Sequence, residues 1–297
     1  MKKLLLILLC LPMIGFGQVY IPDANFKAYL VGDPLINTNG DSEIQVSEAT
    51  AFNGTINCSS MNIADLTGIE DFTALTDLIC ASNDLTSLDV SQNTALIWLD
   101  CSYNQLTTLD VSQNTALTWL ACPYNQLTTL DVSGATALFA LNCEYNQLTT
   151  LDVSNNTAFT YLGCQFNQLE CLDISNNTAL TTLYCQDNLL EQLNTKNGNW
   201  QNMQIDALNN NLTCVEVNNL GYANTNWIGS FDGFVTFSTD CNYANPCVTV
   251  SAIQEHTTNK ELLKVTDILG RETKGTKNEV LFYIYDDGTV EKRIVIE

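Results

Sequence analysis

The chain has 297 residues, 45% hydrophobic content and a formal net charge of −22, so it is long and apolar enough to bury a large core. The charge is uneven, because residues 18–247 hold twenty-four acidic residues and only two basic ones, Lys27 and Lys196. Such a surface repels nucleic-acid phosphates and anionic lipid, which argues against nucleic-acid partners. It suits basic partners, calcium or plain solubility.

Residues 1–17 have the pattern of a secretory signal. Lys2 and Lys3 precede an apolar run over residues 4–11, and small residues precede Gln18, before which we expect cleavage. The run is too short to span a bilayer, and no later stretch is long and apolar enough. We therefore expect an exported protein that is not membrane-spanning.

Residues 18–55 are expected to cap the open end of the repeat array that follows. Within them, residues 37–48 resemble an EF-hand-type calcium loop, although Ser42 stands at the sixth place, where that loop needs Gly. The candidate ligands are Asn37, Asn39, Asp41, Glu43 and Glu48. Two interpretations stay open: a calcium site, or a polar turn ahead of a helix that starts near Ser47. No other cofactor is expected.

Residues 56–217 repeat a 21-residue unit, written most plainly as LIWLDCSYNQLTTLDVSQNTA from Leu96 to Ala116. A repeat this short cannot bury its own apolar side, so neighbouring copies must stack and share a core. Two side chains mark the period, a Cys (from Cys80 to Cys185) and an Asn (from Asn83 to Asn188). The residues predicted to face inward in one copy are Leu96, Leu99, Cys101, Leu106, Leu109 and Val111.

The string L-x-x-L-x-C-x-x-N-x-L in these copies resembles the leucine-rich repeat, with Cys in a place that family usually gives to Leu. The resemblance implies a mainly β, curved solenoid with a parallel sheet on its concave face. A 21-residue unit leaves no room for a helix of normal length, so we expect turns or a second narrow strand on the opposite side. The Asn is expected to turn the chain and bond the backbone of the next coil.

Outward positions next to the concave strands carry aromatic residues in phase with the repeat. The first column holds Trp98, Trp119 and Tyr161, and the second holds Tyr103, Tyr124, Tyr145 and Phe166. Neighbouring coils lie about 4.8 Å apart, which predicts two adjoining aromatic stripes on one face. Patches of this kind favour recognition of an extracellular protein or of the sugar rings of a polysaccharide. The alternative is stacking that only stiffens the sheet.

The repeated cysteines are interpreted as small buried hydrophobic residues with inert thiols. Cys214 stands at an exposed position of the last coil, and Cys241 closes the segment that follows. A disulfide between them would fix a C-terminal cap over residues 218–247.

The sequence predicts a non-enzymatic protein. The only histidine, His256, lies outside the repeats, so they contain no Ser–His or Cys–His pair. The repeated aspartates are interpreted as turn formers, with a shared calcium ion as the alternative; they are Asp89, Asp110, Asp131, Asp152 and Asp173. The alternative function is a secreted carbohydrate-active module or a weak glycosidase using a carboxylate pair.

Residues 248–297 contain short strands and most of the basic residues, and end in a hairpin around Asp286-Asp287-Gly288. They resemble the C-terminal sorting domain of the type IX secretion system of Bacteroidetes. The resemblance implies a small β-sandwich-like domain that engages the secretion machinery, with transport through the periplasm to the outer-membrane surface or the medium. Together these features predict a bacterial leucine-rich-repeat adhesion protein.

Overall fold

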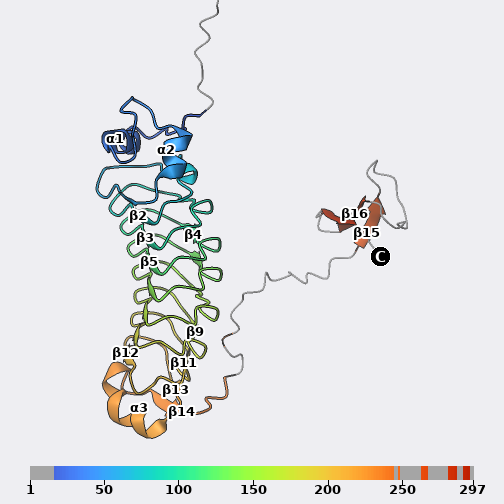
Figure 1. Cartoon of the computed structure of the whole chain (residues 1–297). Helices are drawn as coiled ribbons and strands as arrows, with labels where there is room; N and C mark the ends of the chain where they lie inside the picture. The colour runs from blue at the N-terminus through green and yellow to red at the C-terminus, as the bar shows by residue number, and fades with distance from the viewer. Residues whose placement is uncertain (1–16, 244–246, 248–261, 267–279, 286–289, 295–297) are drawn as a thin grey trace, which may run out of the picture. The chain divides into compact units, whose positions relative to one another are not determined.

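The computed structural model describes residues 17–243, 247, 262–266, 280–285 and 290–294. The chain divides into two compact units, residues 1–249 and 250–297. In the first unit the coils stack into one elongated solenoid (Figure 1). Apart from Gly17, the predicted signal segment lies outside the described residues. Among the described residues, no helix has the length and apolar character needed to cross a membrane.

Two short helices close the N-terminal end of the solenoid (Figure 1). Helix α1 (Ala24–Gly32) begins where the Asp23 side chain accepts two main-chain N–H groups of the first turn, which a helix start otherwise leaves open. Helix α2 (Val46–Ala51) begins where the Glu48 carboxylate reaches back to the main chain of the capping residue. Phe26 of α1 is fully buried, so this helix covers the apolar end of the first coil.

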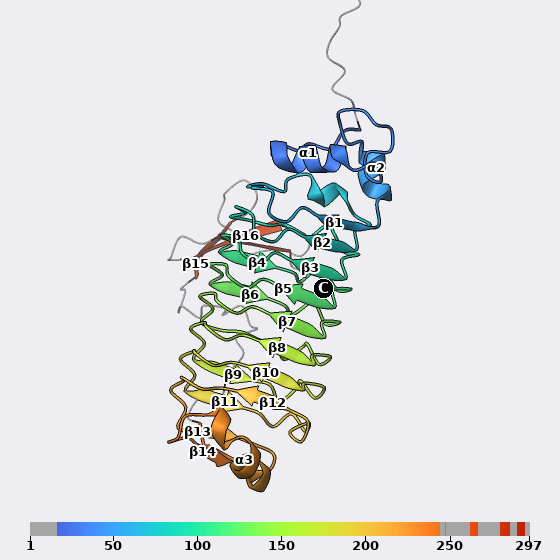
Figure 2. The same cartoon turned by 90° about the vertical axis from the view of Figure 1, so that its left-hand side faces the viewer.

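One strand from each coil joins a parallel sheet of eight strands, the main sheet (Figure 2). Its strands, in spatial order, are β1 (Thr55–Asn57), β2 (Asp77–Ile79), β3 (Trp98–Asp100), β5 (Trp119–Ala121), β7 (Ala140–Asn142), β8 (Tyr161–Gly163), β10 (Thr182–Tyr184) and β12 (Gln204–Asp206). Equivalent repeat positions pair directly, as Trp98 does with Trp119. The predicted parallel-strand solenoid is therefore confirmed.

The side of the coils opposite the main sheet carries narrow strands, which is one of the two structures that the sequence predicted for it. They are β4 (Thr108–Asp110), β6 (Thr129–Asp131), β9 (Cys171–Asp173), β11 (Gln192–Asn194), β13 (Cys214–Glu216) and β14 (Thr236–Ser238). β4 pairs with β6, and the other four form a parallel sheet in the order β14-β13-β11-β9. Within the repeats, the only helical element of the described chain is the short 3-10 helix η1 (Ile69–Asp71).

The six residues predicted to face inward in the copy that starts at Leu96 are all buried, the most accessible being Leu109 at 3%. The same positions are buried in the neighbouring copies, except Leu88, which is partly buried, so the stacked coils share one continuous apolar core. Burying this surface is the main driving force for folding.

The repeated Asn joins each coil to the backbone of the coil before it, whereas the sequence predicted a bond to the next coil. The side-chain N–H groups of Asn104 donate to the carbonyl oxygens of Cys80 in the preceding coil and Cys101 in its own, at 3.0 and 3.1 Å. Its Oδ1 accepts the N–H of Leu85 in the preceding coil, at 3.0 Å. One buried amide thus satisfies main-chain groups that would otherwise be buried without partners.

Seven cysteines form a ladder inside the main sheet, and all are free and buried. They are Cys58, Cys80, Cys101, Cys122, Cys143, Cys164 and Cys185. Burial raises the pKa of Cys58 to about 12 and raises the pKa of Cys80 as well. These thiols are therefore unreactive in the folded protein, as the sequence predicted.

The last coil ends in helix α3 (Leu220–Asn226), the 3-10 helix η2 (Ile228–Ser230) and the edge strand β14. The second unit contains β15 (Leu262–Thr266), β16 (Val280–Tyr285) and β17 (Val290–Ile294), which form an antiparallel sheet in that order. β16 and β17 pair as the predicted terminal hairpin. Its expected turn lies outside the described residues.

Candidate binding face

Four aromatic rings stack in a row at the turn that follows the main-sheet strands. They are Tyr103, Tyr124, Tyr145 and Phe166, which we call the ring ladder. Successive ring centroids lie 4.4, 4.3 and 4.2 Å apart, with planes within 13° of parallel. The side chains are 53%, 38%, 37% and 36% exposed in that order. Because the rings lie face to face, the inner rings offer mainly their edges and hydroxyls to solvent.

The backbone of the ring ladder is in the left-handed region, with φ between 51° and 55°. Flanking coils place Ser82, Asp187 and Asn209 at the same turn position with similar φ. Asn and Asp adopt this conformation readily, whereas a bulky residue there costs roughly 1–2 kcal/mol. A stacked ring pair contributes about 0.5–1.5 kcal/mol beyond its buried area. Three stacked pairs contribute about 1.5–4.5 kcal/mol and so offset only part of the strain of four such residues, about 4–8 kcal/mol. The ring ladder therefore gives the fold no net stability.

A second aromatic group lies at the opposite ends of the same strands. Trp98 and Trp119 begin β3 and β5, and their rings stack at 4.6 Å with an interplanar angle of 3°. Phe139 meets Trp119 edge to face at 6.0 Å and is 41% exposed. We call these three residues the indole cluster. Sequence reasoning missed Phe139, because it lies one residue before the repeat column that was followed.

Both aromatic groups border the outer surface of the main sheet, the indole cluster at the start of its strands and the ring ladder at the turn after them. Tyr161 joins neither group, because Ala140 stands between it and Trp119 in the column. Its hydroxyl lies 2.8 Å from the point where a Cβ on Gly163 would stand, so only glycine leaves room for this ring. Burial, followed by the nearby Glu144, raises the pKa of Tyr161.

The outer surface of the main sheet and its bordering turn carry acidic side chains. They are Asp77, Asp100, Glu144, Asp187 and Asp206. The only two lysines of residues 17–243 form ion pairs in other parts of the chain, Lys27 with Glu43 and Lys196 with Glu216, each at 2.6 Å. The potential over this surface is therefore negative.

The five repeated aspartates lie on the far side from the main sheet and act as turn formers. The Oδ1 atom of each accepts the main-chain N–H of the serine two residues later, at 2.8–2.9 Å. The bond from Ser91 lowers the pKa of Asp89. Each carboxylate thus has a structural role in its turn.

The candidate calcium loop lies between α1 and α2. Glu48 Oε1 accepts the main-chain N–H groups of Thr38 and Asn39, at 2.8 and 3.0 Å, and its Oε2 accepts that of Gln45 at 2.9 Å. Asn37 donates its amide to main-chain oxygens. Among the described residues, no group of three acidic, Cys or His side chains is arranged to hold a metal. In this arrangement both Glu48 carboxylate oxygens accept main-chain bonds, which Glu48 would have to release in order to bind calcium. Calcium binding by this loop stays a prediction.

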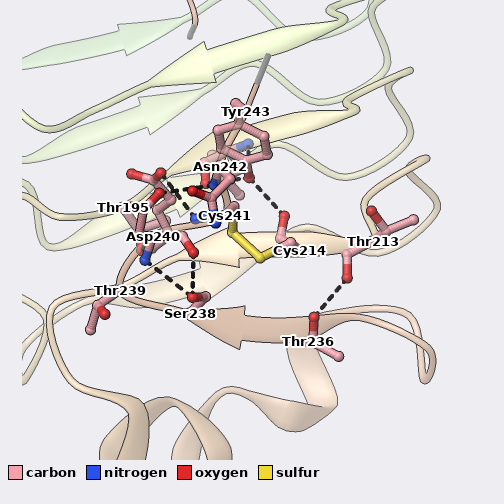
Figure 3. The surroundings of a disulfide bond; sticks show 12 residues. Thr195, Thr213, Cys214, Thr236, Ser238, Thr239, Asp240, Cys241, Asn242 and Tyr243 are labelled. Atoms are coloured by element: carbon pink, nitrogen blue, oxygen red, sulfur yellow. Dashed lines mark hydrogen bonds between the residues drawn. A yellow bond between two sulfur atoms is a disulfide. The ribbon is translucent and has the colours of Figure 1, made fainter. Parts of the chain in front are cut away.

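The C-terminal cap is fastened by two disulfides. Cys214 is linked to Cys241, the pair named from the sequence, with Cα atoms 5.9 Å apart (Figure 3). Next to it, the Tyr243 hydroxyl donates to the carbonyl oxygen of Cys214 at 2.8 Å. Cys171 is linked to Cys247 with Cα atoms 5.7 Å apart, a pair the sequence did not suggest. Tyr243 thus contacts β11 and β13, and Cys247 is bonded to β9.

Comparisons with known proteins agree with this geometry. The LVIVD repeat family matches residues 151–184. Internalin J of Listeria monocytogenes serotype 4b is 40% identical over 75 residues, a match that spans only 8% of that protein and 25% of this chain. The solved structure of the Listeria internalin inlF is 19% identical, with a TM-score of 0.55 over 73% of this chain and 68% of that one. The Listeria internalin inlC2 is 20% identical, with a TM-score of 0.56 over 73% and 94%.

The fold is a leucine-rich-repeat solenoid. The repeat match and the two internalin structures together support a leucine-rich-repeat-type bacterial protein. In this leucine-rich-repeat solenoid, Cys fills the strand position that the resemblance assigns to Leu, and the ring ladder occupies the turn after it.

Proposed function

We propose that this chain is an exported, non-enzymatic binding protein of the adhesion type, which recognises an extracellular protein or polysaccharide with the outer surface of its main sheet. The observation that carries the proposal is the ring ladder: four exposed rings held in a strained turn. Strained residues tend to gather where a protein binds its ligands. The similarity to internalin J and to internalin structures supports a surface-binding role.

A purely structural role for the rings fits less well, because the flanking coils build the same turn without them. The rings occur in four successive coils, and the indole cluster borders the same part of the sheet. Large, rigid aromatic side chains are the residues that most often anchor a partner.

The double variant Tyr124→Ala, Trp119→Ala tests the proposal. The full chain is screened against extracellular proteins and a glycan array, and the variant is expected to lose the binding found for the wild type. Its thermal midpoint is expected to stay within a few degrees, because both side chains point away from the core. Tyr20→Ala, which removes a 73% exposed ring outside the face, serves as the control. Loss of stability with unchanged affinity would place the binding surface elsewhere.

For the tail, we propose that residues 248–297 act as a type IX sorting domain that directs the chain through the periplasm to the outer-membrane surface or the medium. The antiparallel sheet of β15, β16 and β17, separate from the solenoid unit, supports this proposal. Deletion of residues 248–297 is expected to leave a folded solenoid in the periplasm. Normal appearance of the shortened protein at the surface or in the medium would contradict it.

A further inference from the structure

Each aromatic group has one end ring whose neighbour in the adjacent coil is an acidic residue rather than another aromatic residue. In the indole cluster, Trp98 stacks on Trp119 with one face, and the residue paired with it on its other side is Asp77. In the ring ladder, Phe166 stacks on Tyr145 with one face, and Asp187 occupies the same turn position in the next coil. Adjacent coils lie about 4.8 Å apart, so each acidic residue stands one coil away from the ring, on the side of its unstacked face.

A ring face beside a carboxylate is a site for a cation. The electron-rich face of Trp or Phe attracts an ammonium or guanidinium group, and the carboxylate adds an ion pair with the same group. Both carboxylates are held in place: Asp77 Oδ2 accepts the Thr76 hydroxyl at 2.6 Å, and Asp187 Oδ1 accepts the Asn209 amide at 3.0 Å. Because these side chains are already ordered in the free protein, they lose little conformational entropy when a ligand binds.

Sugar stacking is less well served by this surface. A pyranose ring packs on the open face of an aromatic ring, but Tyr124 and Tyr145 have both faces covered by their neighbours in the ladder. Trp119 is covered by Trp98 on one face and contacted by the edge of Phe139. The free faces are mainly those at the ends of the two groups.

We propose that the partner is a cationic protein segment whose Lys or Arg side chains bind at two sites, Trp98 with Asp77 and Phe166 with Asp187. This inference rests on the proposed binding function and narrows its ligand to a basic polypeptide. The negative surface between the two sites, with no basic residue on it, is complementary to such a segment. The sites are about four coils apart, roughly 20 Å along the solenoid, and they also lie at opposite ends of the strands, so an extended stretch must be longer than about six residues to reach both.

Binding of a fluorescent Arg- and Lys-rich peptide of twelve residues to the full chain, followed by anisotropy, tests the inference. Asp77→Asn and Asp187→Asn are each expected to weaken binding about fivefold or more. The matched controls are Glu170→Gln and Glu191→Gln, which remove the same charge at exposed positions off the main sheet and are expected to change binding less than twofold. Asn suits the turn at residue 187, because Asn209 occupies the same turn position. The thermal midpoint of each variant checks its folding.

A second arm uses a neutral β-glucan oligosaccharide as the probe, with Tyr124→Ala, Trp119→Ala as the variant. If the four charge variants weaken peptide binding equally, the attraction is only overall charge and the inference is overturned. If the glucan binds through the aromatic groups and the peptide does not depend on Asp77 or Asp187, the binding function stands and the cationic partner is wrong. If the variants change the binding of neither the peptide, the glucan nor any partner found in the screen, both the proposed binding function and the cationic partner are wrong.

Discussion

Tyr124 and Asn125 are neighbours in one turn, yet they contribute very differently to stability. Asn125 donates to the carbonyl oxygens of Cys101 and Cys122, at 3.0 and 3.2 Å, and accepts the N–H of Leu106 at 2.9 Å. Asn125→Ala leaves these buried groups unpaired and is expected to lower the free energy of unfolding by about 2–4 kcal/mol. Tyr124→Asn relieves backbone strain while losing two stacked contacts, so we expect a change of only about 1 kcal/mol.

Urea unfolding followed by circular dichroism measures both changes. The exposed Gln126, next in the chain, provides a control as Gln126→Ala, for which we expect almost no effect. A Tyr124→Asn variant as unstable as Asn125→Ala would mean that the ring ladder is a structural element.

Glu48 makes the N-terminal cap sensitive to acid. Partial burial disfavours its charged form, but the bonds from Gln45, Thr38 and Asn39 outweigh this and lower its pKa. A lowered folded-state pKa means that its stabilisation is complete above the unfolded value of about 4.5 and is lost as pH falls through the folded value. The protection of the α2 amides against hydrogen exchange, relative to the intrinsic exchange rate at each pH, is therefore expected to fall below about pH 4, and Glu48→Gln is expected to remove this dependence.

Calcium titration of the same two proteins tests the predicted loop. If calcium binds, it should protect α2 in the wild type at neutral pH and have no effect on Glu48→Gln, because the twelfth ligand is lost. Equal protection of both proteins would count against this loop as the site.

At the scale of elements, the last coils depend on covalent links more than the middle ones do. The middle coils have neighbours on both sides, whereas the end of the array is covered only by α3, η2 and β14. The Cys214–Cys241 disulfide spans 27 residues, and a loop of that length stabilises by about 3.5 kcal/mol in the chain-entropy estimate.

The double variant Cys214→Ser, Cys241→Ser is therefore expected to destabilise the C-terminal end first. Native-state hydrogen exchange should show faster exchange in β13 and β14 while β3 and β5 stay protected. Uniform acceleration through all coils would show instead that the solenoid unfolds as one cooperative unit. Cys101→Ala, which removes a free buried thiol, separates the effect of the disulfide from that of losing a sulfur atom.

At the scale of the whole molecule, the twenty-four acidic residues between positions 18 and 247 repel one another, and only two lysines oppose them. Added salt screens this repulsion, because the Debye length falls from about 30 Å at 0.01 M to about 8 Å at 0.15 M. The thermal midpoint of the full chain is expected to rise by several degrees over this range of NaCl. An equal concentration of sucrose controls for solute effects, and a midpoint that falls with salt would show that attractive ion pairs dominate.

The sequence by itself determined everything that repeats from one coil to the next. A strict 21-residue period places equivalent residues side by side on neighbouring strands, so the direct pairing of Trp98 with Trp119 followed from counting. The inward Leu and Cys positions, the bonding role of the repeated Asn and the turn role of the repeated Asp followed for the same reason. Of the candidate face, the residues of the ring ladder were predictable, because each is in phase with the repeat.

Only the tertiary structure decided which residues of one coil lie near each other and which contacts form beyond the end of the repeats. The spacing of Trp98 and Tyr103 along the chain did not reveal that they lie at opposite ends of a strand, because that depends on where the turn bends. Phe139 joins the indole cluster through its contact with Trp119, and Cys247 is bonded to Cys171 of β9 although the two are 76 residues apart in the sequence. These contacts do not recur from coil to coil, so the period of the sequence does not predict their positions. Their geometry depends on how the whole chain packs.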